Sequence, residues 1–449
     1  MKDLLLSFKY KIYLKSIQGG IIRVYIETYG CTLNQADSMI MRGYLEEAGV
    51  GFVDGPDDAD VIIVNTCVVR KDTEEKMIKR LSEIEKLYSG AKKIVVAGCM
   101  VSSLPASVKR VAPSASLVTP QTIDRIVDAV FSRERAEYIG GLRSIERIPI
   151  PRGRGVIAPV PISEGCLSDC SFCITKISRG RVRSYPPRAI VNAIKDLVSR
   201  GYREIELASQ DSAVYGFDIG KNFLLPDLVE EILEIDGDYM IRIGMMNPQW
   251  LRRILDRLIE VIKHPKVYKF LHIPVQSGDN RVLRIMKRGY TVEEFEEMVS
   301  EIRRKIPEVT IATDIVVGHP GEDEKAFRNT LDLMERMRFD RVHLAQYSVR
   351  PLTEAAAMPQ VPEHIKKRRS IEAQKLQEKI GLEIHREYIG KRVGVLTTEK
   401  GMREGTTIAR TTSYRQVVIR EELSLGMWID VEISDATFFD LRASRTHIS

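Results

Sequence analysis

Three cysteines stand close together in the segment SEGCLSDCSFC. Cys166, Cys170 and Cys173 have the spacing C-x3-C-x2-C. Thiolates spaced in this way can converge on one metal centre, and three of them on a four-iron cluster leave one iron open to an external ligand. A structural zinc would need a fourth ligand nearby, but the nearest downstream histidine is His264. An odd number of thiols also does not suit disulfides, so the pattern favours an iron–sulfur site over zinc.

The other three cysteines are dispersed. Cys31, Cys67 and Cys99 each follow a short β-branched apolar run, namely RVYIETYG, ADVIIVNT and KKIVVAG. Such runs are typical of strands in a parallel sheet that is buried on both faces. Helical patterns lie between them, SMIMRGYLEEAG and TEEKMIKRLSEIEKLYSG. The alternation predicts an open parallel α/β sheet, whose strands end at a common edge, so all three thiols should reach one rim.

A second strand–helix series follows the linker ERIPIPRGRG at 146–155, which marks a domain boundary. Its strand candidates are APVPISEG, REIELAS, YMIRIGMM, YKFLHIPVQ, TIATDIVVG and RVHLAQYS. Six units over about 190 residues are too few for a closed eight-stranded barrel of roughly 250 residues. The series therefore predicts an open six-unit barrel.

The last sixty or so residues differ in character. Short strand patterns such as RVGVLTT, RQVVIRE and WIDVEIS are separated by glycine turns and predict a small β-barrel. The fold class is α/β overall, with four expected segments. These are an N-terminal extension at 1–21, an open α/β domain at 22–140, a partial barrel domain at 141–385 and the small β-barrel at 386–449.

Composition limits the functional classes. The net charge is +6, from 68 basic and 62 acidic residues, which permits a nucleic-acid partner without requiring one. No apolar run reaches 18 residues, and the first twenty residues lack a continuous apolar core, so we expect neither a membrane span nor a signal peptide. We therefore expect a cytoplasmic protein with reduced thiols, and a monomer.

Several motifs resemble one known family. The cysteine spacing, with Phe172 before the last thiol, is similar to that of the radical S-adenosylmethionine superfamily. The segments ITKISRGRVRSYP, LASQDSAVYG, HIPVQSGDNRVLRIMKRGY, DIVVGHPGE and YSVRPLTEAA resemble the methylthiotransferases. ETYGCTLNQADS, VNTCVV and VAGCM match the N-terminal cysteine domain of that family, and the final barrel resembles its RNA-binding TRAM domain.

The resemblance implies cofactors and ligands. Cys166, Cys170 and Cys173 would hold a [4Fe–4S] cluster whose open iron binds S-adenosylmethionine, the source of a 5′-deoxyadenosyl radical. Cys31, Cys67 and Cys99 would hold a second [4Fe–4S] cluster, whose open iron accepts the sulfur to be methylated and inserted. Polar residues at predicted strand ends would contact S-adenosylmethionine or substrate: Ser209, Gln210, Asp211, Gln276, Ser277 and Asp314.

Two polar groups near the cysteines have alternative interpretations. Asn34, Gln35 and Asp37 follow Cys31 and either hydrogen-bond around a cluster or cap a helix. The arginines of SRGRVRS, which include Arg179, either meet phosphates at the mouth of the site or lie on a solvated surface.

The C-terminal barrel has ten basic and nine acidic residues from Arg386 onward, so its RNA binding rests on fold resemblance. Tyr414, Phe438 and Phe439 could stack on bases, but we favour a place in the barrel core.

The expected activity is insertion of a methylthio group at an unactivated C–H bond. IRIGMMNPQW, HPKVYKFLHIPVQSGDN and EVTIATDIVVGHPGED look most like the branch that modifies C2 of threonylcarbamoyladenosine at position 37 of tRNA, next to the anticodon. Alternatives are isopentenyladenosine in tRNA or an aspartate of a ribosomal protein. A different class, an RNA-binding protein with structural clusters, fits less well because neither triad has a fourth thiolate.

Overall fold

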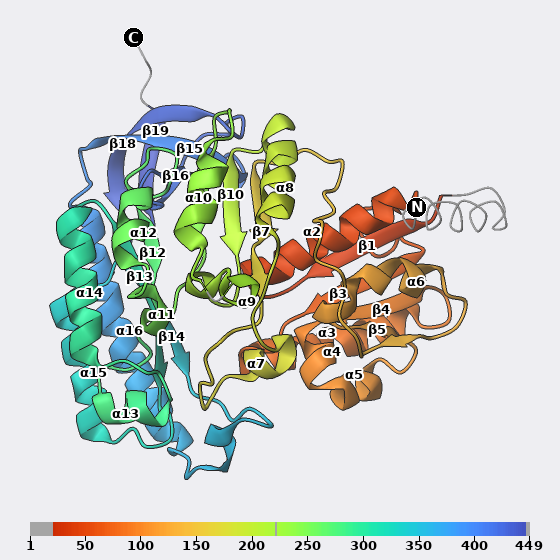
Figure 1. The fold of residues 1–449 in the computed structure, drawn as a ribbon, viewed down its shortest axis with the longest axis horizontal. Helices are drawn as coiled ribbons and strands as arrows, with labels where there is room; N and C mark the ends of the chain where they lie inside the picture. Colours follow the sequence, from red (N-terminus) through yellow and green to blue (C-terminus); the bar gives the residue numbers. More distant parts are fainter. Residues whose placement is uncertain (1–20, 221, 446–449) are drawn as a thin grey trace. The chain divides into compact units, whose positions relative to one another are not determined.

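The computed structural model describes residues 21–220 and 222–445 (Figure 1). The predicted extension at 1–21 therefore lies, but for its last residue, outside the described residues. The described chain forms two compact units. The first contains the residues up to 153 with 159–165 and 174–196, and the second contains 154–158, 166–173 and the residues from 197 onward.

The first unit is built on one parallel sheet, as the sequence predicts. Its strand order is β2-β1-β3-β4-β5-β6, and each neighbouring pair is parallel. The strands are β1 (Arg23–Thr28), β2 (Gly51–Phe52), β3 (Val61–Thr66), β4 (Lys93–Gly98), β5 (Ser116–Val118) and β6 (Glu137–Tyr138). All six residues of β3 are buried, which explains its continuous apolar sequence.

Helices connect these strands. They are α2 (Thr32–Glu47), α3 (Lys71–Tyr88), α4 (Cys99–Ser103), α5 (Pro105–Val111), η1 (Pro120–Arg125) and α6 (Ile126–Phe131). Helix α2 begins six residues earlier than the SMIMRGYLEEAG pattern suggests and buries Leu33, Ala36 and Ile40 along one face. Because α2 starts directly after Cys31, the first thiol stands at a helix N-terminus.

A segment from beyond the cysteine loop packs within the first unit. It comprises β8 (Ser163–Glu164), α7 (Ile174–Arg179), β9 (Arg183–Ser184) and most of α8 (Pro187–Ser199). Ile174 is buried in the same apolar cluster as Cys99 and Met100, and Ile177 packs against that cluster. The first unit therefore includes side chains from both sides of the cysteine loop, which itself belongs to the second unit.

The second unit contains a partial barrel of parallel strands. One sheet has the order β11-β10-β7 and another β12-β13-β14, and a parallel bridge between Ile241 and Val267 links β11 to the chain before β12. The strands are β7 (Ile157–Pro161), of which residues 157 and 158 belong to the second unit, β10 (Glu204–Ala208), β11 (Met240–Ile243), β12 (Phe270–His272), β13 (Thr310–Val317) and β14 (Arg341–Gln346). The six strands follow chain order, and their number agrees with the predicted six-unit barrel.

Helices separate these strands. They are η2 (Ser212–Val214), α9 (Phe217–Gly220), α10 (Leu225–Leu233), α11 (Pro248–Leu251), α12 (Leu255–Ile262), α13 (Asn280–Ile285), α14 (Val292–Lys305), α15 (Glu324–Met337) and η3 (Glu354–Ala357). Local sequence sets their ends. Thr291 and Glu294 form a capping box at the start of α14, and Asp323 accepts a hydrogen bond from the Ala326 amide at the start of α15.

The C-terminal strands close into a barrel in the order β15-β16-β17-β19-β18 (Figure 1). They are β15 (Arg392–Lys400), β16 (Thr407–Thr411), β17 (Gln416–Ile419), β18 (Trp428–Ala436) and β19 (Leu441–Arg445), and they follow the long helix α16 (Glu363–Arg386). Alternating residues such as Val417, Ile419, Val431 and Ile433 fill the interior. This confirms the predicted small barrel.

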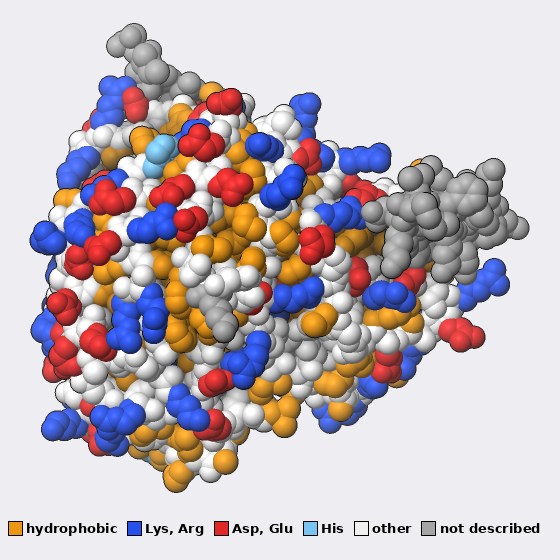
Figure 2. Space-filling view, in the orientation of Figure 1, with side chains coloured by type: hydrophobic (Ala, Val, Ile, Leu, Met, Phe, Trp, Pro, Cys, Tyr) orange, Lys and Arg blue, Asp and Glu red, His pale blue; other side chains and the backbone are white. Residues whose placement is uncertain are grey.

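Charged side chains of both signs are mixed on the face of the molecule shown in Figure 2. Figure 2 shows Lys and Arg side chains interspersed with Asp and Glu side chains over the face in view. Among the described residues, none of the helices has both the length and the apolar character required to cross a bilayer.

Candidate cofactor sites

The three dispersed cysteines stand at the ends of three neighbouring strands. Cys31 follows β1 after a short turn, Cys67 directly follows β3, and Cys99 directly follows β4. Parallel strands end at the same edge of a sheet, so the topology brings the thiols to one rim, as the spacing predicts. Cys67 and Cys99 are buried and Cys31 is exposed. One side of the group is therefore open.

The pKa shifts also indicate that these thiols lie close together. Burial raises the pKa of Cys99 to about 12; Cys31 and Cys67 raise it further, while Arg179 opposes the shift. Burial likewise raises the pKa of Cys67, and Cys31 acts in the same direction. Thiols in this environment stay protonated near neutral pH unless a metal ion stabilises the thiolate.

Backbone space around the group is restricted at Gly30. Its φ is +108°, and a Cβ there would lie 2.9 Å from the Cys67 sulfur. A larger residue would therefore be strained and would crowd the thiol. Glycine at this position keeps the space beside Cys67 free.

Asn34 and Asp37 lie beside the thiols and do not cap a helix. The N-cap residue of α2 is Cys31, which makes no side-chain capping bond. The Asn34 amide donates to the backbone oxygens of Tyr29 (2.8 Å) and Thr66 (2.9 Å). Gln35 is exposed. Of the two interpretations, the structure favours interaction near the cysteines for Asn34 and Asp37.

Arg179 joins this group from helix α7. It donates to the Cys99 sulfur (3.2 Å) and to the Asn34 side-chain oxygen (2.6 Å), and it forms an ion pair with Asp37 (2.6 Å). Its side chain is 1% exposed. Both predictions for Arg179, a phosphate contact at the mouth and a solvated surface, are wrong, because α7 packs within the first unit.

A second buried arginine completes the network. Arg143 lies 3.7 Å from Asp37, pairs with Glu164 and donates to the Tyr185 hydroxyl at 2.6 Å. No role was predicted for Arg143, which lies in no motif, or for Glu164, which lies two residues before Cys166 in the cysteine segment. Two arginines and two carboxylates thus balance one another under the thiol group.

The clustered cysteines lie in a loop of the second unit. Burial raises the pKa of Cys166 to about 12, and Asp211, Cys173 and Cys170 raise it further. The Ser168 amide donates to the Cys166 sulfur at 3.4 Å. All three thiols are half-buried. The loop therefore gathers three thiols within eight residues without help from a sheet.

Arg288 is the main cation beside this loop. It donates to the Cys170 sulfur (3.2 Å) and to the backbone oxygen of Pro274 (3.0 Å), and its Nε contacts the Tyr290 hydroxyl (2.9 Å). It is 6% exposed, and no carboxylate of the described residues pairs with it. Arg288 lies in the quoted segment RIMKRGY, but sequence analysis gave it no role.

The predicted residues at the ends of β10 are held in place by neighbouring groups. Asp211 is buried and accepts hydrogen bonds from the amides of Ala213 (3.2 Å) and Asn247 (3.1 Å). Ser209 hydrogen-bonds Ser212 (2.8 Å). Asn247 donates to the Ser168 hydroxyl (2.9 Å), which connects this strand end to the cysteine loop. Contact of Ser209, Gln210 and Asp211 with S-adenosylmethionine stays a prediction.

The residues after β12 are also held by contacts with neighbouring elements. Gln276 adopts a φ of 74° and its backbone bridges β13, donating to Asp314 (2.8 Å). Ser277 is fully buried, and its hydroxyl lies 3.5 Å from that of Thr330 on α15. Their predicted contact with the cofactor stays a prediction as well.

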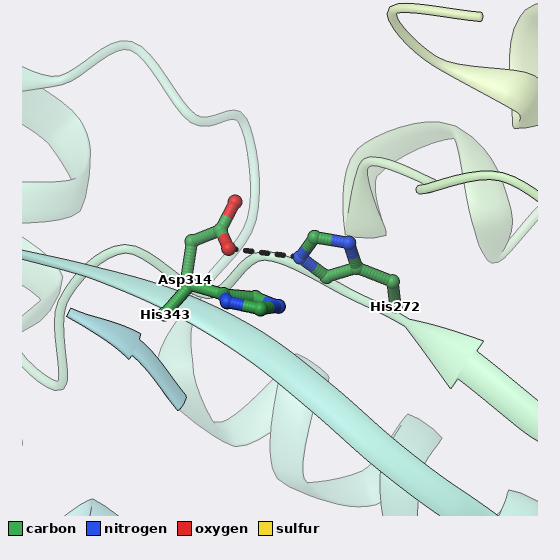
Figure 3. Close-up of side chains that lie close together, drawn as sticks. All are labelled: His272, Asp314 and His343. Carbon is green, nitrogen blue, oxygen red and sulfur yellow. Dashed lines mark hydrogen bonds and ion pairs between the residues drawn. The ribbon is translucent and has the colours of Figure 1, made fainter. Parts of the chain in front are cut away.

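Asp314 belongs to a group that sequence analysis did not assemble. Its carboxylate is 2.8 Å from the His272 ring, and His343 lies on the neighbouring strand directly opposite (Figure 3). The three ligand atoms lie within 4.8 Å of one another. Burial lowers the pKa of His343 to about 4, with His272 acting in the same direction, so this ring is neutral. The group offers hydrogen-bonding atoms inside the barrel.

The aromatic residues of the C-terminal barrel have different positions. Tyr414, at a φ of 62°, donates to Glu204 (3.1 Å) and Glu206 (2.8 Å) of β10. Phe438 and Phe439 are 40% and 44% exposed. The preferred place in the barrel core is therefore wrong for all three. Tyr414 joins the small barrel to the partial barrel, and the two phenylalanines lie partly exposed outside the barrel interior.

Both thiol groups fit an iron–sulfur cluster. Each offers three cysteine sulfurs without a disulfide, each has an arginine that donates to one sulfur, and neither has a fourth cysteine. Iron–sulfur clusters in proteins are held by thiolates and tuned by hydrogen bonds to sulfur. Three ligands would leave one iron free of protein in each cluster.

Three regions of the chain match models of known protein families. Residues 23–119 match Uncharacterized protein family UPF0004, residues 160–334 match the Radical SAM superfamily, and residues 386–445 match the TRAM domain.

Several curated proteins match nearly the full chain. Proteins from Archaeoglobus fulgidus (43% identity, 93% of this chain and 97% of the relative) and Pyrococcus horikoshii (42%, 89% and 94%) are named probable threonylcarbamoyladenosine tRNA methylthiotransferases. The Homo sapiens threonylcarbamoyladenosine tRNA methylthiotransferase is 34% identical over 93% of this chain and 73% of its own length. Among solved structures, the radical S-adenosylmethionine methyltransferase TsrM from Kitasatospora setae shares the fold, with a TM-score of 0.54 at 14% identity over 85% of this chain and 79% of its own.

Proposed function

The chain belongs to the threonylcarbamoyladenosine tRNA methylthiotransferases, and we propose that it transfers a methylthio group to C2 of N6-threonylcarbamoyladenosine at position 37 of tRNA. The observation that carries this proposal is the presence of two separate triads of cysteines, each with an arginine on a sulfur. The full-length similarity to relatives with this name supports the choice of substrate.

The cofactors are two [4Fe–4S] clusters and S-adenosylmethionine. We assign Cys166, Cys170 and Cys173 to one cluster and Cys31, Cys67 and Cys99 to the other. When bound, the first supplies radical chemistry with S-adenosylmethionine and the second holds the sulfur that is transferred.

The protein's own residues position and tune these groups. Arg179 and Arg288 donate N–H groups to sulfur and place a positive charge beside thiolates. Asp211, held by two backbone amides, and Asn247, which binds Ser168, fix the strand end next to the cysteine loop. Because Gly30 has no side chain, the space beside the Cys67 sulfur stays free.

The substrate partner is tRNA. We propose contact with the anticodon loop, because position 37 lies there and the C-terminal barrel is a TRAM domain. Tyr414 supports this arrangement because it ties that barrel to the strands of the partial barrel.

Mass spectrometry of tRNA nucleosides tests the proposal. The reconstituted enzyme, with reductant and S-adenosylmethionine, should convert threonylcarbamoyladenosine in tRNA to its 2-methylthio derivative. Methylthiolation of isopentenyladenosine or of a ribosomal-protein aspartate would instead assign another substrate. If no 5′-deoxyadenosine forms at all, the proposal of an enzymatic function is wrong and the clusters are structural.

A further inference from the structure

A cavity of about 280 Å³ lies in the second unit, between the partial barrel and the C-terminal barrel. Four arginines line it, Arg242, Arg341, Arg410 and Arg415, whereas Asp340 is the only carboxylate among its lining residues. Aromatic rings, among them Phe270, Tyr414 and Phe439, form much of the remaining wall. An excess of guanidinium groups in a confined space favours an anionic ligand.

Three of the arginines are held by neighbouring residues but keep a free donor. Arg410 contacts Gln416 (3.1 Å) and Glu399 (3.0 Å), and Arg415 pairs with Asp340. Arg242 lies 3.6 Å from Glu206. Yet Nε of Arg242, Nε of Arg410 and Nη1 of Arg415 are buried without a hydrogen-bond partner among the described residues. Buried N–H groups of this kind are normally satisfied, so a ligand would stabilise them.

Arg341 is the least compensated of the four. It stacks over the Phe439 ring at 4.3 Å, and its side chain forms no ion pair or hydrogen bond with the described residues. Burial lowers its pKa, and the neighbouring Arg410 and Arg242 lower it too. Arg341 therefore lies near two other cations, and no carboxylate of the described residues pairs with it.

The lining of the cavity extends along strand β14 from Arg341 to His343. Arg341 and His343 are two residues apart on β14, so they share a face of the strand. His343 also lines the cavity, and it stands beside Asp314 and His272 (Figure 3). The cavity lining thus includes one member of the His272, Asp314 and His343 group.

We propose that this cavity binds the carboxylate of the threonylcarbamoyl group of the substrate, with Arg341 as the principal partner and Arg242 and Arg410 beside it. The inference rests on the proposed function. A backbone phosphate offers the same anionic chemistry, but a cavity of this size with aromatic walls suits one small side group better than a stretch of polynucleotide. These arginines then select threonylcarbamoyladenosine against bases with an uncharged substituent.

Two nucleosides test the idea on the unmodified holoenzyme. Isothermal titration should show binding of N6-threonylcarbamoyladenosine, and conversion of its carboxylate to a methyl ester should weaken binding about 10-fold to 100-fold, since a charge-assisted hydrogen bond is lost. Equal affinity for acid and ester would overturn the proposal. Methylthio transfer measured by nucleoside mass spectrometry would still stand in that case, so the two failures are distinguishable.

Variants separate the carboxylate from phosphate. Arg341→Gln should weaken binding of tRNA that carries threonylcarbamoyladenosine about 10-fold or more, but change the affinity for the same tRNA with unmodified adenosine by less than about twofold. Arg341→Lys, which keeps the charge, should recover part of the loss. Arg420→Gln, on an exposed residue of the same C-terminal barrel, is the matched control and should affect both tRNAs alike. Equal losses for both tRNAs with Arg341→Gln would show a phosphate contact and reject the carboxylate, and no loss for either would also reject it.

Discussion

The two groups of three cysteines are brought together by different parts of the structure. In the first unit, three strands of one sheet deliver Cys31, Cys67 and Cys99 from distant parts of the chain. In the second unit, one loop holds Cys166, Cys170 and Cys173 within eight residues. The first group exists only when the sheet has formed, whereas the second is mainly a property of local sequence.

Their surroundings differ as well. Arg179 shares its buried network with Asp37, Arg143 and Glu164, so its charge is balanced by protein. Arg288 has a sulfur, a carbonyl oxygen and a hydroxyl as partners, and no carboxylate of the described residues pairs with it. The balanced network can stabilise the first unit without a cluster, whereas Arg288 is suited to compensate negative charge on thiolates or a cluster.

The largest expected effect separates the two groups by reaction. Cys170→Ala should reduce 5′-deoxyadenosine formation to the assay background, because the loop loses a ligand. Cys31→Ala should abolish methylthio transfer but leave 5′-deoxyadenosine formation, and iron should fall from roughly eight to about four per chain. Iron analysis and chromatography of the anaerobically reconstituted proteins check this. Complete iron loss in Cys31→Ala would contradict the existence of two independent groups.

A smaller effect tests the balanced network. Asp37→Asn leaves two buried arginines against Glu164 alone and should lower the free energy of unfolding of the first unit by about 3–5 kcal/mol. Arg179→Met should cost a similar amount, while the double variant should cost less than the sum because the charge balance returns. Urea denaturation of the cluster-free proteins, followed by circular dichroism, measures this. Additive losses would mean that Asp37 and Arg179 are not energetically coupled.

The smallest effect concerns the unbalanced arginine. Arg288→Met removes a positive charge and a donor to Cys170, so the reduction potential of the cluster in the loop should become more negative. A change on the order of 60 mV corresponds to about 1.4 kcal/mol, within the range for one hydrogen bond to a charged group. Arg288→Lys should shift the potential less. Redox titration followed by electron paramagnetic resonance measures this potential, and the signal of the other cluster serves as the internal control. An unchanged potential in Arg288→Met would exclude a role of Arg288 in setting it.

The sequence predicts the cysteine groups better than it predicts their surroundings. Continuous apolar runs identify the strands of a parallel sheet, and the shared carboxyl edge of such a sheet predicts that Cys31, Cys67 and Cys99 meet. By contrast, Arg143, Glu164 and Tyr185 come from irregular segments and short strands whose packing no local pattern records. Arg179 was misplaced because exposure of a basic residue is the usual expectation, and only the packing of α7 within the first unit overturns it.

The cavity in the second unit could not be predicted from the sequence either. Arg242, Arg341 and Arg410 are spread over 168 positions and three strands, so no spacing rule links them. Phe439 is exposed because its turn lies outside the interior of the small barrel, although its type alone favours burial.

Tyr414 has a consequence for the evolution and engineering of the molecule. Its ring lies 4.8 Å from Tyr268 and 4.9 Å from Phe270, and its hydroxyl contacts two glutamates of β10. The C-terminal barrel is therefore not an interchangeable module. A chimera that carries another RNA-binding barrel would lose the packing of Tyr414 on Tyr268 and Phe270 and its hydrogen bonds to Glu204 and Glu206, although Glu204 would keep the Tyr268 hydroxyl as a donor. Exchange of domains therefore requires both sides of this contact to change together.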